Sequence, residues 1–109
     1  MFAYTGRSIE VKYDTGYHFR IDYLPNHQMR WTSLKKRTDG APMTGVETYH
    51  LHQQGEHIFT LNWIEDSGLS VSQNLDFTKL EVYAFMSWND STARGGRAIL
   101  EHQGKITLL

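Results

Sequence analysis

Residues 9–23 read IEVKYDTGYHFRIDY, and this stretch decides the fold. Apolar or aromatic side chains alternate with charged or polar ones on both sides of a central Asp14-Thr15-Gly16 segment. Alternation with a period of two is typical of a β-strand that buries one face. Glycine readily adopts the positive φ that a tight hairpin needs. The stretch therefore predicts an antiparallel hairpin whose buried face carries the odd-numbered residues.

Similar segments follow at regular spacing along the chain. Besides 9–13 and 17–23, we predict strands over 28–34, 46–52, 57–65, 69–74, 79–86, 97–102 and 105–109. The last two would form a hairpin about Gln103-Gly104, while 35–45 and 88–96 would be loops. Closure removes the unpaired edges of so many short strands. We therefore expect one all-β domain over 1–109, a small antiparallel meander β-barrel of eight to nine strands.

Composition narrows the class of protein. The 109 residues include no cysteine, so neither a disulfide framework nor a thiolate metal site is possible, and a reducing cytoplasmic setting is expected. Eleven basic side chains are scattered along the chain and the net charge is −1, so no nucleic-acid partner is expected. The N-terminal residues lack the apolar run of a signal peptide, and no stretch is long enough for a membrane span, so no membrane partner is expected either.

Glu65 is the candidate for acid–base chemistry. Alternation along 57–65 places His57, Phe59, Leu61, Trp63 and Glu65 on one face, and the rings mark that face as the inward one. A carboxylate at an inward position is costly unless it is paired, so its pKa is raised and it can act as a general acid or base. In the alternative interpretation, Glu65 lies at the strand end, opens to water and begins the 65–68 turn.

Further aromatic residues share the inward face of the first three strands by the same alternation. They are Tyr13, Tyr17, Phe19, Tyr23 and Trp31. Such rings can pack a ligand while phenol hydroxyls bind its polar groups, although an ordinary aromatic core would look the same. His50 and His52 have a spacing that could chelate a metal, but alternation turns them to solvent. We therefore expect no metal site.

Several of these segments resemble a known family. Tyr13-Asp14-Thr15-Gly16-Tyr17, Met29-Arg30-Trp31 and Trp63-Ile64-Glu65-Asp66-Ser67-Gly68, followed by Val71, resemble the bacterial phenolic acid decarboxylases and their MoaF-type, lipocalin-like relatives. The resemblance implies a flattened calycin-type barrel, commonly dimeric, that needs no cofactor. In the decarboxylases, which convert hydroxycinnamic acids to vinylphenols, a Glu and an Arg act near the reacting end and a Tyr pair holds the other.

The match at these functional positions is incomplete. The family Glu corresponds to Glu65 and the second Tyr to Tyr13, whereas the first Tyr falls on Val11. The family Arg falls in the segment 43–46, which contains no Arg, and Arg37 is the nearest but out of register. These departures favour the MoaF-like branch over the decarboxylases.

Three functions remain open. The first is binding of a small aromatic or planar apolar molecule by Tyr17, Phe19, Tyr23, Trp31 and Trp63 together with Tyr13 and Glu65. The second is a cofactor-free lyase or isomerase in which Glu65 donates a proton and Tyr13 donates a hydrogen bond to the substrate. The third is an interaction module. A homodimer is expected, because the strand at 79–86 has apolar side chains on both faces.

Overall fold

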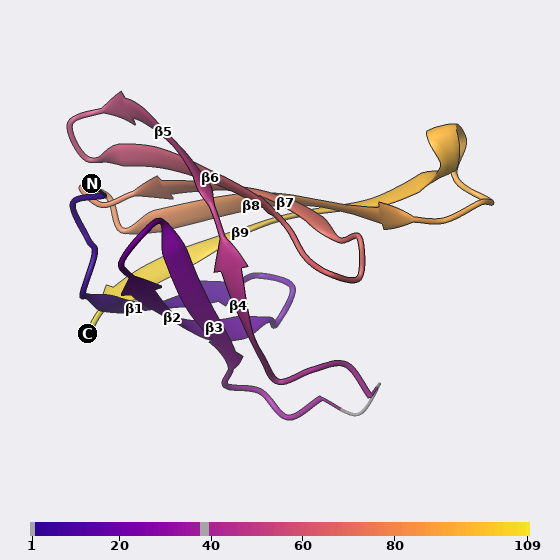
Figure 1. The fold of residues 1–109 in the computed structure, drawn as a ribbon, viewed down its shortest axis with the longest axis horizontal. Coiled ribbons are helices and arrows are strands. Elements are labelled where there is room, and N and C mark those ends of the chain that lie inside the picture. The colour runs from indigo at the N-terminus through magenta and orange to yellow at the C-terminus, as the bar shows by residue number, and fades with distance from the viewer. Residues whose placement is uncertain (1, 38–39) are drawn as a thin grey trace.

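The computed structural model describes residues 2–37 and 40–109, and in this part of the chain every long element is a strand (Figure 1). The nine strands are β1 (Ser8–Tyr13), β2 (His18–Leu24), β3 (Gln28–Ser33), β4 (Thr44–Thr48), β5 (His50–Gly55), β6 (Ile58–Ile64), β7 (Ser70–Asp76), β8 (Glu81–Asn89) and β9 (Arg97–Leu108). One short 3₁₀ turn, η1 (Arg94–Gly96), precedes β9. No helix among the described residues has the length and hydropathy of a membrane span.

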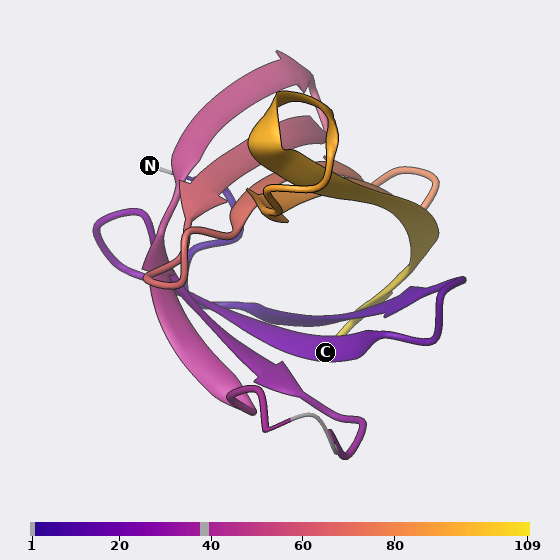
Figure 2. The same cartoon turned by 90° about the vertical axis from the view of Figure 1, so that its right-hand side faces the viewer.

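The strands form one antiparallel sheet in the order β4-β3-β2-β1-β9-β8-β7-β6-β5. Strands that follow one another in the sequence pair with each other, except for β4 and β5, which form the two edges of the sheet. The first and last strands, β1 and β9, also pair with each other. Figure 2 shows the sheet curling round so that β1, β2 and β3 face β5, β6 and β7. The predicted all-β antiparallel barrel is confirmed as a nearly closed barrel of nine strands.

The first hairpin follows the alternation of its sequence. Val11 pairs with Phe19 and Ile9 with Ile21, and the side chains of Ile9, Val11 and Ile21 are buried. Gly16 supplies the turn with a φ of 97°, a backbone conformation that other residues rarely adopt. The predicted inward face of the odd-numbered residues is confirmed for β1 and β2.

The single strand predicted over 46–52 is wrong, because it is two strands that belong to opposite edges of the sheet. β4 begins at Thr44 and pairs with β3, whereas β5 pairs with β6. Between them, Tyr49 is fully buried and donates its backbone N–H to the carbonyl of His27. The alternation continues across this junction, so the pattern of side chains hides the change of partner strand.

The hairpin predicted about Gln103-Gly104 is also wrong, because β9 runs through it as one strand of 12 residues. Gly104 lies opposite both Tyr13 of β1 and Val82 of β8. A Cβ at this position would lie 1.9 Å from the Lys12 carbonyl oxygen, so glycine is required for the close approach of β1. At the other end of the β8–β9 pair, β8 extends to Asn89 and includes Trp88, which the sequence placed in a loop.

One end of the barrel is filled by its own side chains. Phe2 packs edge-on against Tyr23 and Phe59, with ring centroids 4.8 and 5.0 Å apart, and lies 5.8 Å from the ring of Tyr49. These residues come from the end of β2, the junction after β4 and the start of β6, which antiparallel pairing brings to the same end. We call this group of Phe2, Tyr23, Tyr49 and Phe59 the aromatic plug.

Candidate functional site

The opposite end of the barrel holds a cavity of about 720 Å³. This volume lies within the range of about 300–1,000 Å³ that is usual for small-molecule sites. Its walls come from β1, β2, β3 and β4, from the end of β6 and the turn after it, and from parts of β7, β8 and β9. Among the described residues that line it are six aromatic side chains: Tyr13, Tyr17, Phe19, Trp31, Trp63 and Trp88.

Most residues predicted for the site are brought together here. Those that line the cavity are Tyr13, Tyr17, Phe19, Trp31, Trp63 and Glu65. Tyr23 is not among them, because it lies in the aromatic plug. It shares a face with Tyr17, but six residues of strand separate the two by roughly 20 Å along the barrel.

The histidines considered from the sequence, His50, His52 and His57, lie away from the cavity. His57 precedes β6 in a turn and is exposed, so its predicted inward position is wrong. The neighbouring strand β5 has a register shift between Gln53 and Gly55, next to this turn. His50 and His52 are exposed, as predicted. Within 2–37 and 40–109, no group of three or more His, Cys, Asp or Glu side chains could hold a metal ion.

Glu65 follows directly after the last residue of β6 and projects into the cavity. Trp63, two residues earlier on the same face, donates its indole N–H to Glu65 Oε2 at 3.2 Å. Burial raises the pKa of the Glu65 carboxyl, and the nearby Glu47 raises it further, against the opposing effects of the Trp63 hydrogen bond and Arg37. The backbone of Glu65 also begins the 65–68 turn through the bond from Gly68 N–H to its carbonyl. Both interpretations of Glu65 thus describe part of its geometry.

Glu47 is a second carboxylate in the cavity, and the sequence analysis missed it. Trp31 on β3 donates its indole N–H to Glu47 Oε2 at 2.9 Å. Glu47 shares strand parity with Tyr49 and Leu51, so the alternation that turned His50 and His52 outward could have revealed it. The neighbouring sequence Glu47-Thr48 carried no motif that drew attention to it.

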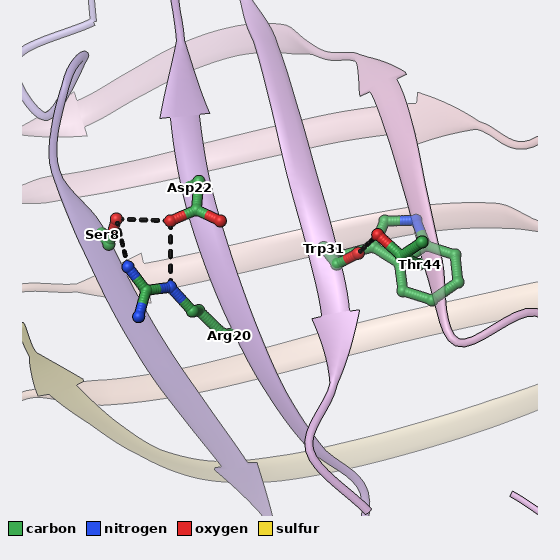
Figure 3. Close-up of polar contacts among 5 residues, drawn as sticks. All are labelled: Ser8, Arg20, Asp22, Trp31 and Thr44. Atoms are coloured by element: carbon green, nitrogen blue, oxygen red, sulfur yellow. Dashed lines mark hydrogen bonds and ion pairs between the residues drawn. The ribbon is translucent and has the colours of Figure 1, made fainter.

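Gly45 makes room for the Trp31 ring. A Cβ on Gly45 would lie 2.8 Å from two atoms of that ring, so the indole lies directly against the β4 backbone. Thr44 also joins β4 to β3 at this point, because its hydroxyl donates to the backbone carbonyl of Trp31 at 2.9 Å (Figure 3). Figure 3 also shows the separate polar group of Ser8, Arg20 and Asp22 on β1 and β2.

Arg37 reaches the mouth of the cavity from the loop between β3 and β4. Its guanidinium lies over the Tyr17 ring at 5.9 Å and donates to the Pro42 carbonyl at 2.9 Å. The sequence register had excluded this arginine, but a loop is not bound by strand register. Residues 38 and 39 of the loop predicted over 35–45 lie outside the described residues.

The floor of the cavity carries a buried polar pair. Gln73 on β7 donates through Nε2 to the Tyr13 hydroxyl at 2.9 Å, and its Oε1 atom has no hydrogen-bond partner among the described residues. Burial raises the pKa of Tyr13, so its phenol is neutral. Behind it, the His102 ring stacks on Tyr13 at a centroid distance of 3.7 Å, and burial lowers the pKa of that histidine.

These features define a small antiparallel β-barrel with one plugged end and one open, aromatic and acidic cavity. The family model described as MoaF-like matches residues 5–99, and the chain belongs to the MoaF-like family. One similar solved structure is that of a candidate β-lactamase from Burkholderia vietnamiensis. It has 21% sequence identity and a TM-score of 0.79, with 98% of this chain and 96% of that chain covered, which shows a shared fold. No curated protein matches the sequence.

Proposed function

We propose that the barrel binds a small aromatic or planar apolar molecule in the cavity between Trp31 and Trp63. The observation that carries this proposal is the cavity of about 720 Å³, which is lined by both the rings and the carboxylates. Each of the two indoles is held by a hydrogen bond to a carboxylate, so the walls are ordered before a ligand arrives. A preorganised site loses less entropy when it binds.

The apolar walls provide the driving force. A planar ligand that buries about 150 Å² of apolar surface gains roughly 4 kcal/mol from removal of that surface from water. Part of this gain is offset by the loss of translational and rotational freedom. The apolar contacts alone therefore support weak binding, and the polar groups Glu47, Glu65 and Gln73 would supply the remaining affinity and the specificity.

A cavity-filling variant tests the proposal. Met86 lines the cavity from β8, whereas its neighbour Phe85 points to the outside of the barrel. A panel of planar aromatic acids, phenols, alcohols and amines is titrated calorimetrically into the full chain. We expect at least one to bind, Met86→Trp to abolish that binding, and the matched control Phe85→Trp to retain it. No binding across the panel, or equal loss in both variants, would contradict the proposal.

A second candidate is a cofactor-free lyase or isomerase, and the raised pKa of Glu65 favours it. The Glu65 carboxylic acid would donate its proton to a substrate carbon, with the electron pair for the new C–H bond taken from a substrate double bond. In a decarboxylation, release of CO₂ would return its bonding pair to that double bond, and solvent would reprotonate Glu65. Release of CO₂ from hydroxycinnamic acids, lost in Glu65→Gln, is the expected result. Unchanged turnover in that variant would contradict this candidate.

The outer face of β8 gives less support to an interaction module or a homodimer. The Tyr83 hydroxyl donates to Glu101 at 2.6 Å, and Phe85 lies between Ser72 and Glu101 on the neighbouring strands. Polar side chains thus lie on both sides of Phe85, which gives little support to an apolar interface at this strand. Light scattering of the full chain tests the expected dimer.

A further inference from the structure

Resting on the proposed function, we propose that the cavity selects an organic cation, in which an ammonium or amidinium group is joined to a planar apolar body. The cation would lie against Glu47 and Glu65. Its apolar body would lie between the rings of the wall. This charge preference is opposite to that of the hydroxycinnamate anions suggested by the sequence resemblance.

The charges of the cavity lining carry the first step. The described residues of the lining include three carboxylates, Glu47, Glu65 and Asp66, and one basic side chain, Arg37. Arg37 donates to the Pro42 carbonyl and lies over the Tyr17 ring, so part of its binding capacity is already used. Three carboxylates against one guanidinium give this lining an excess of acidic groups. Such an excess attracts cations and repels carboxylate ligands.

The second step is the arrangement of Glu47 and Glu65. Glu47 lies on β4, one edge strand of the sheet, and Glu65 follows β6, the strand next to the opposite edge. β4 and β6 contact each other where the barrel nearly closes. Each carboxylate accepts one indole N–H on Oε2, and neither forms an ion pair at salt-bridge distance within the described chain. Two carboxylates that share a partly buried site repel each other. A cation bound between them would relieve this repulsion.

The third step is independent of charge and comes from the floor of the cavity. Gln73 is 3% exposed, and its Oε1 atom lacks a partner among the described residues. A buried carbonyl oxygen without a donor costs free energy, and a ligand N–H or O–H would satisfy it. The indole donors of Trp31 and Trp63 are already used by the carboxylates. The free hydrogen-bonding atoms of Glu47, Glu65 and Gln73 are therefore acceptors, and a ligand that contacts these three groups would supply donors.

The ring faces favour the same class of ligand. A cation near the face of a tryptophan is attracted by the electron density of the ring, and desolvation strengthens this attraction. Trp31 and Trp63 both line the cavity, and Trp63 is buried. The carboxylates and the indole rings of the cavity therefore both favour a cationic ligand.

Three probes of similar shape and different charge test the inference: naphthylmethylamine, naphthylmethanol and naphthoic acid. Each is titrated calorimetrically into the full chain at neutral pH, where the amine is a cation and the acid an anion. We expect the amine to bind about tenfold more tightly than the alcohol, because one desolvated charge pair is worth on the order of a tenfold change in affinity. The acid should bind most weakly.

Charge-removing variants separate this inference from the proposed function. Glu47→Gln and Glu65→Gln should each weaken amine binding about tenfold more than they weaken alcohol binding. Glu56→Gln, in an exposed turn with a side chain that is 90% exposed, is the matched control and should change neither. If the alcohol or the acid binds as tightly as the amine, the charge preference is overturned while the binding function stands. If none of the three binds, both proposals fail.

Discussion

The indole N–H of Trp31 on β3 donates to the carboxylate of Glu47 on β4 at 2.9 Å, across the two strands that form one edge of the sheet. The same pair of groups recurs on the facing side, where Trp63 donates to Glu65 at 3.2 Å. In both cases a rigid ring fixes a carboxylate within the cavity. The acidic groups are therefore positioned by the walls that would contact a ligand.

Substitution of Gly45 should displace the Trp31 ring. In Gly45→Ala, the new Cβ would lie 2.8 Å from that ring, and overpacking of this kind costs about 1–3 kcal/mol. We expect a lower free energy of unfolding in urea, and weaker binding of any cavity ligand, because the bond from Trp31 to Glu47 is disturbed. Gly55→Ala is the control, since a Cβ there makes only ordinary contacts of 3.6 Å or more. Equal stability of the two variants would contradict the packing described for Trp31.

The stability of the barrel should depend on pH through Glu65. Burial raises its pKa in the folded chain above that in the unfolded chain, so the folded state binds the proton more tightly. This contribution is complete below the pKa of the unfolded chain and is lost as the pH rises through the folded pKa. Relative to Glu65→Gln, the wild-type chain should therefore lose stability across that range.

Urea midpoints of both proteins over a series of pH values measure this effect. Glu56→Gln serves as the control, because its side chain is exposed and should follow the wild-type curve. A wild-type chain that gained stability over Glu65→Gln as the pH rose would show that Glu65 is stabilised in its charged form, contrary to the burial described here.

Gly104 should be among the positions least tolerant of substitution. In Gly104→Ala, the Cβ would lie 1.9 Å from the Lys12 carbonyl oxygen and 2.7 Å from the Tyr13 Cα, so β1 and β9 could not keep their present spacing. We expect a loss of about 4 kcal/mol or more, a size reserved for a few severe mechanisms. Hydrogen exchange should show the amides of β1 losing protection. A variant as stable as Gly55→Ala would contradict the close approach.

Arg97 should hold the turn that carries Glu65. Its guanidinium donates to the Gly68 carbonyl, to Ser70, to Asn89 and twice to Ser87, at 2.8 to 3.2 Å. Arg97→Lys keeps the charge but loses the planar fork, so it should cost about 1–3 kcal/mol and speed amide exchange at Gly68 and Leu69. Arg94→Ala, at an exposed position in η1, should do neither. Similar exchange in the two variants would argue against this role.

The inward face of the barrel could be predicted from the sequence, but position along the barrel axis could not. Alternation correctly placed Tyr13, Phe19 and Trp63 inward, because a strand has only two faces. The same rule placed Tyr23 inward without showing that it lies in the aromatic plug rather than in the cavity. Depth depends on how the strands pair, and that is a property of the whole sheet.

Other errors have the same tertiary origin. Glycine is common both in turns and where two backbones lie close together. The packing of β1 against β9 shows that Gly104 allows a close backbone contact and does not form a turn. Alternation could have placed Glu47 inward, but its contact with Trp31, 16 residues away, arises only through the β3–β4 pair. Arg37 was set aside by strand register, although it lies in a loop that folds back to the cavity.

Nuclear magnetic resonance can show whether the barrel interior binds a ligand. In a ¹H–¹⁵N spectrum of the full chain, each tryptophan gives a separate indole signal. Titration with naphthylmethylamine should shift the indole signals of Trp31 and Trp63 and the side-chain amide signal of Gln73. Absence of shifts, or shifts confined to residues on the outer face such as Ile64 and Phe85, would contradict binding inside the barrel.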